Sequence, residues 1–398
     1  MQKKRSPILA VYIHIPFCRT ICPFCSFTVR RDRAKMHEKY IRGLMEEIDK
    51  RAKMLIDIEN KDHEEKICEQ NFLESIYLGG GTPSCLTIEE VSKVLKKIRE
   101  NFSCSDQIEI SFELNPDDLN EEYLSGLADV GVNRLSLGGQ SFQASTLQKL
   151  GRCHSVSELH NAISVIANSS FDNWNLDLMF GIPEQSIVMF KNDIEEALTY
   201  DPYHISLYGL EIHEQTPFGK NLQIRNWLVE HLEQFEEMYL WATNRLESAG
   251  LFQYEVSNFS KKTYEGRQNL LVWSGNEYLG FGVGAHSYHR KTRWGNVKSV
   301  MVYLQNIRKN MWPTEFVEQL TVKQQAVEFL MLSLRQNAGI NFREWEELFG
   351  LDLQKQQLDY LQELCDDGRA FWNGNQFCLT SWGMLLADRI IVNLMPEK

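Results

Sequence analysis

Three cysteines fall within eight residues near the start of the 398-residue chain, in the stretch CRTICPFCSF. Cys18, Cys22 and Cys25 follow the spacing Cys-x3-Cys-x2-Cys, and closely spaced thiolates of this kind bind zinc or an iron-sulfur cluster. A structural zinc ion takes four nitrogen or sulfur ligands, and the nearest imidazoles, His14 and His37, are not convincing candidates for the fourth. A [4Fe-4S] cluster accepts three thiolates when another group binds its fourth iron, so the spacing favours a reactive cluster.

Composition and charge narrow the class of protein. The chain carries 54 acidic and 42 basic residues, a formal net charge of −12, so its field repels phosphate backbones and nucleic acid is not an expected partner. The apolar N-terminal run is interrupted by Pro7, His14 and Pro16, and no apolar stretch reaches the roughly 18 residues of a membrane span. We therefore expect a cytoplasmic protein without a signal peptide or a membrane span.

The remaining cysteines show no regular spacing. Nine cysteines in total, an odd number, suit a reducing compartment better than a disulfide framework. We expect the six isolated ones to be small buried residues: Cys68, Cys85, Cys104, Cys153, Cys365 and Cys378.

The first half of the chain alternates short apolar runs with longer amphipathic segments. The runs predicted as strands are 8–15, 75–78, 108–114, 134–137, 173–179 and 204–210. The segments predicted as helices lie near 36–55, 88–102, 120–129, 157–168 and 188–199. Six βα units in a row predict an α/β fold with a parallel sheet. Nearly every run passes straight into polar or glycine-rich residues, which favours a complete or partial barrel over a doubly wound sheet.

The pattern changes after about residue 225. A helix is predicted over 227–249, and from about 318 a small domain begins with a helix over 322–334. Asn341 and Glu344 predict a capping box, a further helix lies near 354–366, and Asn373-Gly374 predicts a type I′ hairpin turn.

That order of elements is typical of a winged helix. Its acidic surroundings favour a packing role over DNA binding, although a zinc-stabilised protein with a DNA-binding winged helix is the alternative at this point. We expect three regions: 1–225, a barrel; 226–317, a barrel extension and connecting segment; and 318–398, a winged-helix-like domain.

The cysteine spacing, with an aromatic residue just before the third cysteine, resembles the signature of radical S-adenosylmethionine (SAM) proteins. The flanking VYIHIPFC resembles one branch, the oxygen-independent coproporphyrinogen oxidase (HemN-like) family and its relatives. The likeness covers about residues 9 to 300 through motifs in the same order: GGGTPS (79–84), ELNPDD (113–118), GVNRLSLGGQSF (131–142), LGRCHS (150–155), NLDLMFGIPEQS (175–186), LYGLEIHEQTPF (207–218) and EYLGFGVGAHSY (277–288).

The resemblance implies a partial (β/α)6 TIM-like barrel whose three cysteines hold a [4Fe-4S] cluster, with SAM on the open iron and an electron donor of the flavodoxin or ferredoxin type. It implies no assigned catalytic residue. The positions that match contacts to a first SAM are Tyr12, Gly80, Glu113 and Asp177. Those that match contacts to a second SAM in the oxidase are Phe24, Gly81, Thr82, Gln140 and Arg152.

Physical chemistry supports several of these assignments and leaves alternatives. Gly79, Gly80 and Gly81 lack a Cβ, so their backbone amides can approach a small zwitterion closely. Acidic side chains at strand ends accept hydrogen bonds from an ammonium group or from ribose hydroxyls. The alternatives are that Asp177 only satisfies a buried layer of the barrel and that Arg152 is a surface charge.

Two features separate the branches of this family. The oxidases carry a further cysteine two residues after the third, where this chain has Phe27, and a long N-terminal extension, where this chain has 17 residues before Cys18. Both departures resemble the heme chaperone (HemW-like) branch, whose members are associated with binding heme and delivering it to apoproteins. The hypothesis is therefore a heme chaperone, with heme or porphyrin and heme-accepting apoproteins as partners; the alternative is a coproporphyrinogen III oxidase.

A third departure concerns the heme ligand. The chaperone branch typically has a histidine, a candidate heme contact, where this chain has Gln268. Glutamine is a poor iron ligand, so an axial ligand would come from elsewhere. The candidate donors are His213, His286, His289 and Cys153.

Overall fold

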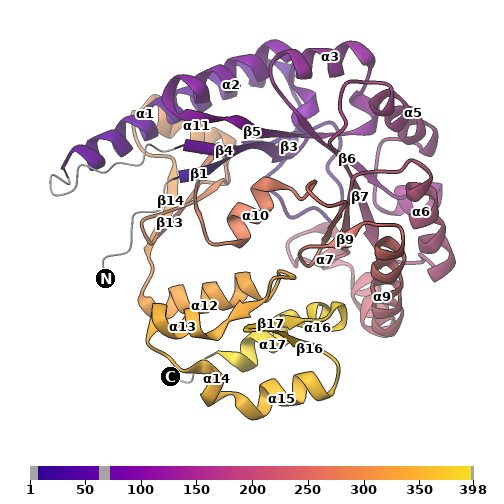
Figure 1. Cartoon of the computed structure of the whole chain (residues 1–398). Helices are drawn as coiled ribbons and strands as arrows, with labels where there is room; N and C mark the ends of the chain where they lie inside the picture. Colours follow the sequence, from indigo (N-terminus) through magenta and orange to yellow (C-terminus); the bar gives the residue numbers. More distant parts are fainter. Residues whose placement is uncertain (1–7, 62–71, 396–398) are drawn as a thin grey trace.

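The computed structural model describes residues 8–61 and 72–395 and contains a 12-stranded mixed sheet (Figure 1). Six of its strands are parallel and adjacent in chain order: β1 (Ile8–Ile15), β4 (Phe72–Gly80), β5 (Ser103–Leu114), β6 (Arg134–Gln140), β7 (Trp174–Phe180) and β8 (His204–Gly209). This order has no reversal point, as in a (β/α) barrel and unlike a doubly wound sheet. The fold is the mixed α/β architecture that the sequence predicts.

Helices cover the outer face of the parallel strands, as Figure 1 shows. They are α1 (Ala34–Lys61), α2 (Ile88–Asn101), α3 (Glu121–Asp129), α4 (Ala144–Lys149), α5 (Val156–Ala167) and α6 (Ile187–Thr199). Their starts are encoded locally: a capping box of Thr87 and Glu90 begins α2, and one of Ser155 and Glu158 begins α5. Their apolar faces pack on the strands in one continuous core that extends to Ile307.

Further strands extend the sheet at both ends and leave it open. Beside β1 lie the parallel β11 (Glu277–Phe281) and then the antiparallel β12 (His286–His289), β13 (Thr292–Asn296) and β14 (Thr314–Gln319). Beside β8 lie β10 (Asn258–Ser260) and β9 (Phe252–Gln253). The helices of this region are α8 (Leu222–Glu230), α9 (Leu232–Ser248), α10 (Arg267–Trp273) and α11 (Val300–Arg308).

One helix predicted here is divided into two. The range 227–249 is interrupted at His231, whose Nδ1 lies 2.7 Å from the carbonyl oxygen of Trp227 and whose ring stacks on the indole of that residue. A hydrogen bond from a side chain to the helix backbone competes with the helical ladder, and this is the physical reason for the break.

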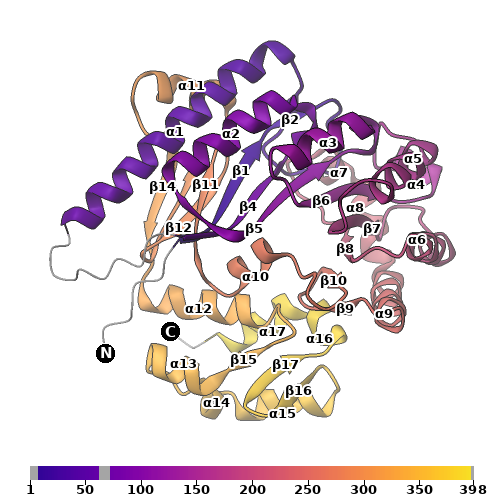
Figure 2. The same ribbon diagram turned by 45° about the horizontal axis from the view of Figure 1, so that its top comes forward.

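The C-terminal domain has its own core, centred on the buried Trp345 and Phe377. Its elements are α12 (Val322–Ser333), β15 (Ile340–Asn341), α13 (Phe342–Phe349), α14 (Leu353–Gln356), α15 (Leu358–Asp366), β16 (Ala370–Asn373), β17 (Gln376–Leu379), α16 (Ser381–Leu385) and α17 (Ala387–Leu394). The sheet order β15-β17-β16 with this succession of helices is that of a winged helix. Figure 2 shows the domain beside α10.

Two local predictions in this domain are corrected. Asn373 pairs with Gln376, so the two-residue turn consists of Gly374 and Asn375, and only Gly374 has a positive φ, 60°. This is the pattern of a type II′ turn rather than type I′. Asn341 caps α13 by accepting hydrogen bonds from the backbone amides of residues 343 and 344, but no return bond completes a capping box.

The isolated cysteines differ in exposure. Cys378 is buried, Cys85, Cys104 and Cys365 are half-buried, and Cys153 is exposed. The prediction of burial is thus wrong for Cys153, which lies in the turn after α4 at the carboxyl end of the strands, and Cys68 lies outside the described residues. In the part of the chain that the structure describes, no helix is both long and apolar enough to cross a bilayer.

Candidate functional site

A cavity of about 450 Å³ opens at the carboxyl ends of the parallel strands. Residues from the cysteine loop and from the ends of β4 to β8 form its wall together. Of the predicted site residues, those that line it are Cys18, Cys22, Phe24, Cys25, Gly80, Gly81, Thr82, Glu113, Gln140, Arg152 and Asp177. The structure thus brings eleven of the twelve predicted residues to one cavity.

The cysteine loop is held between two short strands. In it β2 (Phe17–Cys18) pairs in parallel with β3 (Arg30–Arg31), and the amide of Cys25 donates to the carbonyl of Cys22 over 3.1 Å. Burial raises the pKa of the Cys18 thiol to about 11 and also raises that of Cys25. Bare thiolates are therefore costly here, and the positive charge of bound iron is what would offset that cost.

The arrangement of the three thiols suits a cluster better than a single ion. Among the described residues, no three Cys, His, Asp or Glu side chains converge on one point as ligands of a lone metal ion. Cys18, Cys22 and Cys25 instead all line the cavity. The ligands of an iron-sulfur cluster bind separate irons, whereas those of zinc meet at one atom, so the residues present fit a cluster.

Two carboxylates face this cavity from β5 and β7. Glu113 accepts hydrogen bonds from the Tyr77 hydroxyl over 2.8 Å and from the backbone amide of Gly80 over 2.9 Å. Burial raises the pKa of Glu113 to about 7, and the charge of Asp177 adds to the shift. Burial likewise raises the pKa of Asp177 to about 6, against hydrogen bonds led by Asn175 that lower it. The sulfonium of a bound SAM would supply positive charge that favours the ionised form of these carboxylates.

Arg152 is fixed inside the cavity. Its guanidinium donates to the carbonyl oxygen of Gly138 over 2.9 Å, contacts Asn115 Oδ1, and lies 3.8 Å from the Sγ of Cys22. The alternative of a surface charge is therefore wrong. Sequence reasoning assigned no role to Asn115, although its place directly after β5, in the quoted ELNPDD, was a usable signal.

Gln140, at the end of β6, has a positive φ of 69° that side chains other than glycine rarely adopt. The next residues are fixed by Asp193 of α6, which is 1% exposed and accepts from the Ser141 hydroxyl and the Phe142 amide, each over 2.7 Å. This buried carboxylate holds the turn that aims Gln140 at the cavity.

The glycine turn has a role different from the predicted one. The amide of Gly81 donates to Ile15 O over 2.8 Å and that of Thr82 to Phe17 O over 2.7 Å, so neither is available to a zwitterion. Gly80 has a φ of 110°, and a Cβ there would lie 2.4 Å from the His14 ring. The glycines let this turn pack directly against the strand that leads into the cysteine loop.

The two aromatic residues predicted for the site, Phe24 and Tyr12, differ in their position relative to the cavity. Phe24 lines the cavity, and its ring contacts that of Phe218, which lies in α7 (Pro217–Lys220). Tyr12 is not among the residues of the cavity wall; its ring stacks on Tyr77, and its hydroxyl lies 3.0 Å from Nδ1 of His14. Direct contact between Tyr12 and SAM stays a prediction.

Of the four candidate heme donors, two line the cavity and two lie elsewhere. His213 and Cys153 line the cavity. His286 contacts Phe316 on the outer strands, and His289 is bound to Glu277. Gln268 lies on α10, 7% exposed, away from the cavity wall.

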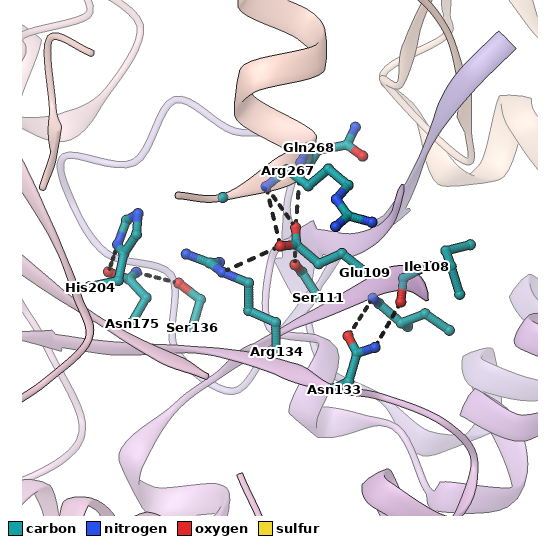
Figure 3. Close-up of polar contacts among 12 residues, drawn as sticks. Ile108, Glu109, Ser111, Asn133, Arg134, Ser136, Asn175, His204, Arg267 and Gln268 are labelled. Atoms are coloured by element: carbon teal, nitrogen blue, oxygen red, sulfur yellow. Dashed lines mark hydrogen bonds and ion pairs between the residues drawn. The ribbon is translucent and has the colours of Figure 1, made fainter. Parts of the chain in front are cut away.

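A second polar cluster fills the opposite end of the barrel interior, the floor (Figure 3). Glu109 accepts hydrogen bonds from the backbone amides of Arg267, over 3.0 Å, and of Gln268, over 3.4 Å, and from the Ser111 hydroxyl. Its carboxylate also lies 3.9 Å from Nε of Arg134, which is 4% exposed. These contacts attach the first turn of α10 to the floor.

A chain of hydrogen bonds continues from the floor to the cavity. Asn175 donates to Asp177 and to Ser136, each over 2.7 Å, while its Oδ1 lies 2.6 Å from Nδ1 of His204. Nε2 of His204 lies 2.8 Å from the hydroxyl of Tyr254. Burial, with a smaller contribution from the charge of Arg134, holds the pKa of His204 well below its usual value and so disfavours the protonated form of this histidine.

Comparison with known proteins adds an independent line of evidence. The sequence model described as "Radical SAM superfamily" matches residues 12–197, and that of the "HemN C-terminal domain" matches residues 320–386. The heme chaperone HemW of Bacillus subtilis (strain 168) is 34% identical over 389 residues, covering 98% of this chain and 99% of that protein. HemW of Lactococcus lactis is 31% identical, covering 98% and 97%.

One further relative and one solved structure are also similar to this chain. The mitochondrial "Radical S-adenosyl methionine domain-containing protein 1" of Danio rerio is 30% identical, covering 98% of this chain and 87% of that protein. Among solved structures, coproporphyrinogen III oxidase (HemN) from Escherichia coli matches with a TM-score of 0.80 and 21% identity, covering 98% of this chain and 90% of that one. At that identity the match establishes the fold.

Proposed function

Because this chain belongs to the HemW-like branch of the radical SAM HemN family, we propose that it is a heme chaperone that binds heme and transfers it to apoproteins. Membership of the family implies a [4Fe-4S] cluster and SAM as cofactors. When bound, these groups supply one-electron chemistry. The cavity residues fit both, as indicated by the thiols of Cys18, Cys22 and Cys25 and by the buried carboxylates of Glu113 and Asp177, whose pKa values are raised.

The observation that carries the proposal is the apolar mouth of the cavity. Phe27, at the position where the oxidases carry a further cysteine, is 68% exposed and lines the cavity, and Ile21, which lines the same cavity, is 47% exposed. Exposed apolar side chains at the mouth of a cavity mark a binding site. A porphyrin offers a flat apolar face, which these two side chains would cover.

His213 is the axial ligand that we assign to the heme iron. It lies in the segment after β8, its side chain is 47% exposed, and it lines the same cavity as Phe27. Its Nε2 lies 3.6 Å from a carboxylate oxygen of Glu211.

The other cavity residues bind and orient the cofactor. Glu113 and Asp177 would accept hydrogen bonds from a cationic ligand, and Arg152, held by Asn115 and Gly138, would present its guanidinium to a carboxylate. The cavity wall contains two arginines, Arg19 and Arg152. The oxidase reaction would require more basic side chains than these to enclose a porphyrinogen with four carboxylates.

The test is a titration of anaerobically reconstituted protein with heme, followed by transfer to an apoprotein. Wild-type protein is expected to bind heme stoichiometrically, His213→Ala to bind at least tenfold more weakly with a shifted Soret band, and the matched control His286→Ala to bind normally. Equal loss in both variants would contradict the assignment of His213. Enzyme-like anaerobic conversion of coproporphyrinogen III to protoporphyrinogen IX would contradict the chaperone proposal itself.

A further inference from the structure

Positive charge is concentrated in the cysteine loop of an acidic chain. Residues 18–35 contain five basic side chains and one acidic one, a formal net charge of +4, whereas the whole chain carries −12. Four of these basic side chains are exposed; Arg19 pairs with Asp118, and the other three are Arg31, Arg33 and Lys35. We call these three residues the basic patch.

The basic patch adjoins the first cysteine of the motif. Arg31 is the Cα partner of Cys18 in the pairing of β3 with β2, and the amide of Asp32 donates to Cys18 O over 2.8 Å. Neighbouring strands in such a pair lie about 4.8 Å apart, so Arg31 stands one strand spacing from a cluster ligand. A molecule docked on the patch would lie beside the cluster.

Nearby carboxylates do not neutralise the basic patch. Asp32 is bound by Nε2 of His37 over 2.6 Å, and Asp118 is bound by Arg19 over 2.5 Å. The side chains of Arg31, Arg33 and Lys35 make no ion pair with any residue in the described ranges. Their charge is therefore directed to solvent.

The basic patch also lies at the N-terminus of α1, where positive charge is electrostatically unfavourable. Lys35 is in the first turn of α1, Arg33 precedes that turn, and the turn contains no acidic residue. The N-terminus of a helix carries partial positive charge, so cations there cost stability, typically 0.3–1 kcal/mol each. The exposed Lys39 and Arg42 follow on the same helix at spacings of four and three residues, and the exposed Glu38 between them and Lys35 lies within electrostatic reach of Lys93. The positive charge is thus not explained by the stability of α1.

We propose that the basic patch is the docking surface for an acidic one-electron carrier protein. Charge complementarity speeds encounter and orients the partner, and transient redox complexes use small interfaces that depend on it. The proposal rests on the cluster of the proposed function and is independent of heme binding. In the complex the carrier loses one electron and the cluster gains one, with no bond made or broken and no proton transferred.

The test compares two charge reversals of equal size. The first variant carries Arg31→Glu, Arg33→Glu and Lys35→Glu. The control variant carries Lys323→Glu, Arg343→Glu and Arg389→Glu, which reverse three exposed cations of the C-terminal domain. That domain lies below α10, away from the start of α1 (Figures 1 and 2). The probe is flavodoxin, oxidised and isotope-labelled for NMR titration, and as the hydroquinone for stopped-flow reduction of the reconstituted protein.

We expect the patch variant to bind flavodoxin at least tenfold more weakly, to be reduced at least tenfold more slowly, and to lose most of the salt dependence seen in wild type. Its thermal midpoint should equal or exceed that of wild type, because glutamate at the start of α1 is favourable. Dithionite should reduce all three proteins alike.

Equal binding, reduction and salt dependence in the two charge-reversed proteins would overturn the proposal. It would equally be overturned if the patch variant lost affinity for anionic vesicles or DNA while flavodoxin binding stayed unchanged. Failure of the cluster to assemble in wild-type protein would instead overturn the proposed function.

Discussion

The two ends of the barrel interior hold similar side chains in opposite electrostatic states. On the floor, Glu109 has a buried guanidinium, Arg134, and two backbone amides as partners (Figure 3). At the cavity, Glu113 and Asp177 have hydrogen bonds from neutral donors, and the pKa of each is raised. A carboxylate with an ion-pair partner supports the fold, whereas buried carboxylates that form no ion pair among the described residues are arranged for a ligand. The difference separates structural from functional acid residues within one sheet.

The largest effect is expected on the floor. Glu109→Ala should lower the free energy of unfolding by about 3–5 kcal/mol. It leaves Arg134 as an unpaired buried charge and removes the hydrogen-bond acceptor of two backbone amides of α10. Equilibrium urea denaturation measures it, with the exposed Glu347→Ala as the control, which should change by less than about 0.5 kcal/mol. A cost for Glu109→Ala similar to that of the control would break the comparison.

At the cavity the same kind of substitution should affect ligand binding instead. Glu113→Gln should weaken SAM binding by about 10- to 100-fold, the worth of a hydrogen bond to a charged group, with stability unchanged or slightly raised. Equilibrium dialysis on the reconstituted protein measures the affinity, and iron content shows whether the cluster is intact. Unchanged affinity with full iron content would exclude a role of Glu113 in SAM binding.

The raised pKa of Glu113, about 7, also predicts a pH dependence. An acid whose pKa is higher in the folded than in the unfolded chain favours folding most below the unfolded value, and that contribution is lost as pH rises to the folded value. Stability of the cofactor-free protein should therefore fall between about pH 4.5 and 7, and Glu113→Gln should flatten that part of the curve. Parallel curves for the two proteins would contradict the raised pKa.

The smallest effect is expected for Gln268→His. This residue lies at the floor, away from the cavity, so restoring the histidine typical of the chaperone branch should change heme affinity by less than twofold. A tenfold gain, read from a heme titration, would place the heme at the floor instead of the cavity mouth.

The repeating pattern predicted the parallel sheet well because strands and helices are encoded by local periodicity. β1 occupies the predicted range 8–15, and α2 and α5 begin at capping boxes that are visible in the sequence. The type II′ turn at Gly374 was missed by one residue because turn type depends on which residues pair across the hairpin, and pairing is not local.

The site was predicted less completely because side-chain contacts depend on register and on loops. The motifs led to the three cysteines, Glu113 and Asp177, yet not to Asn115 or Asp193, whose roles follow from contacts with residues 37 and 52 positions away. The prediction that backbone amides of the glycine turn face a ligand is wrong for Gly81, because its amide donates to Ile15 O of β1, a contact that the sequence does not reveal.

The most direct test of the account is the number of protons released when SAM binds. Calorimetric titration of reconstituted protein near pH 6.5, in two buffers of different ionisation enthalpy, measures it. The account predicts net release, because a cation in the cavity lowers the pKa of Glu113 and Asp177 from about 7 and about 6, and it predicts less release in Glu113→Gln. Proton uptake, or equal exchange in both proteins, would contradict it.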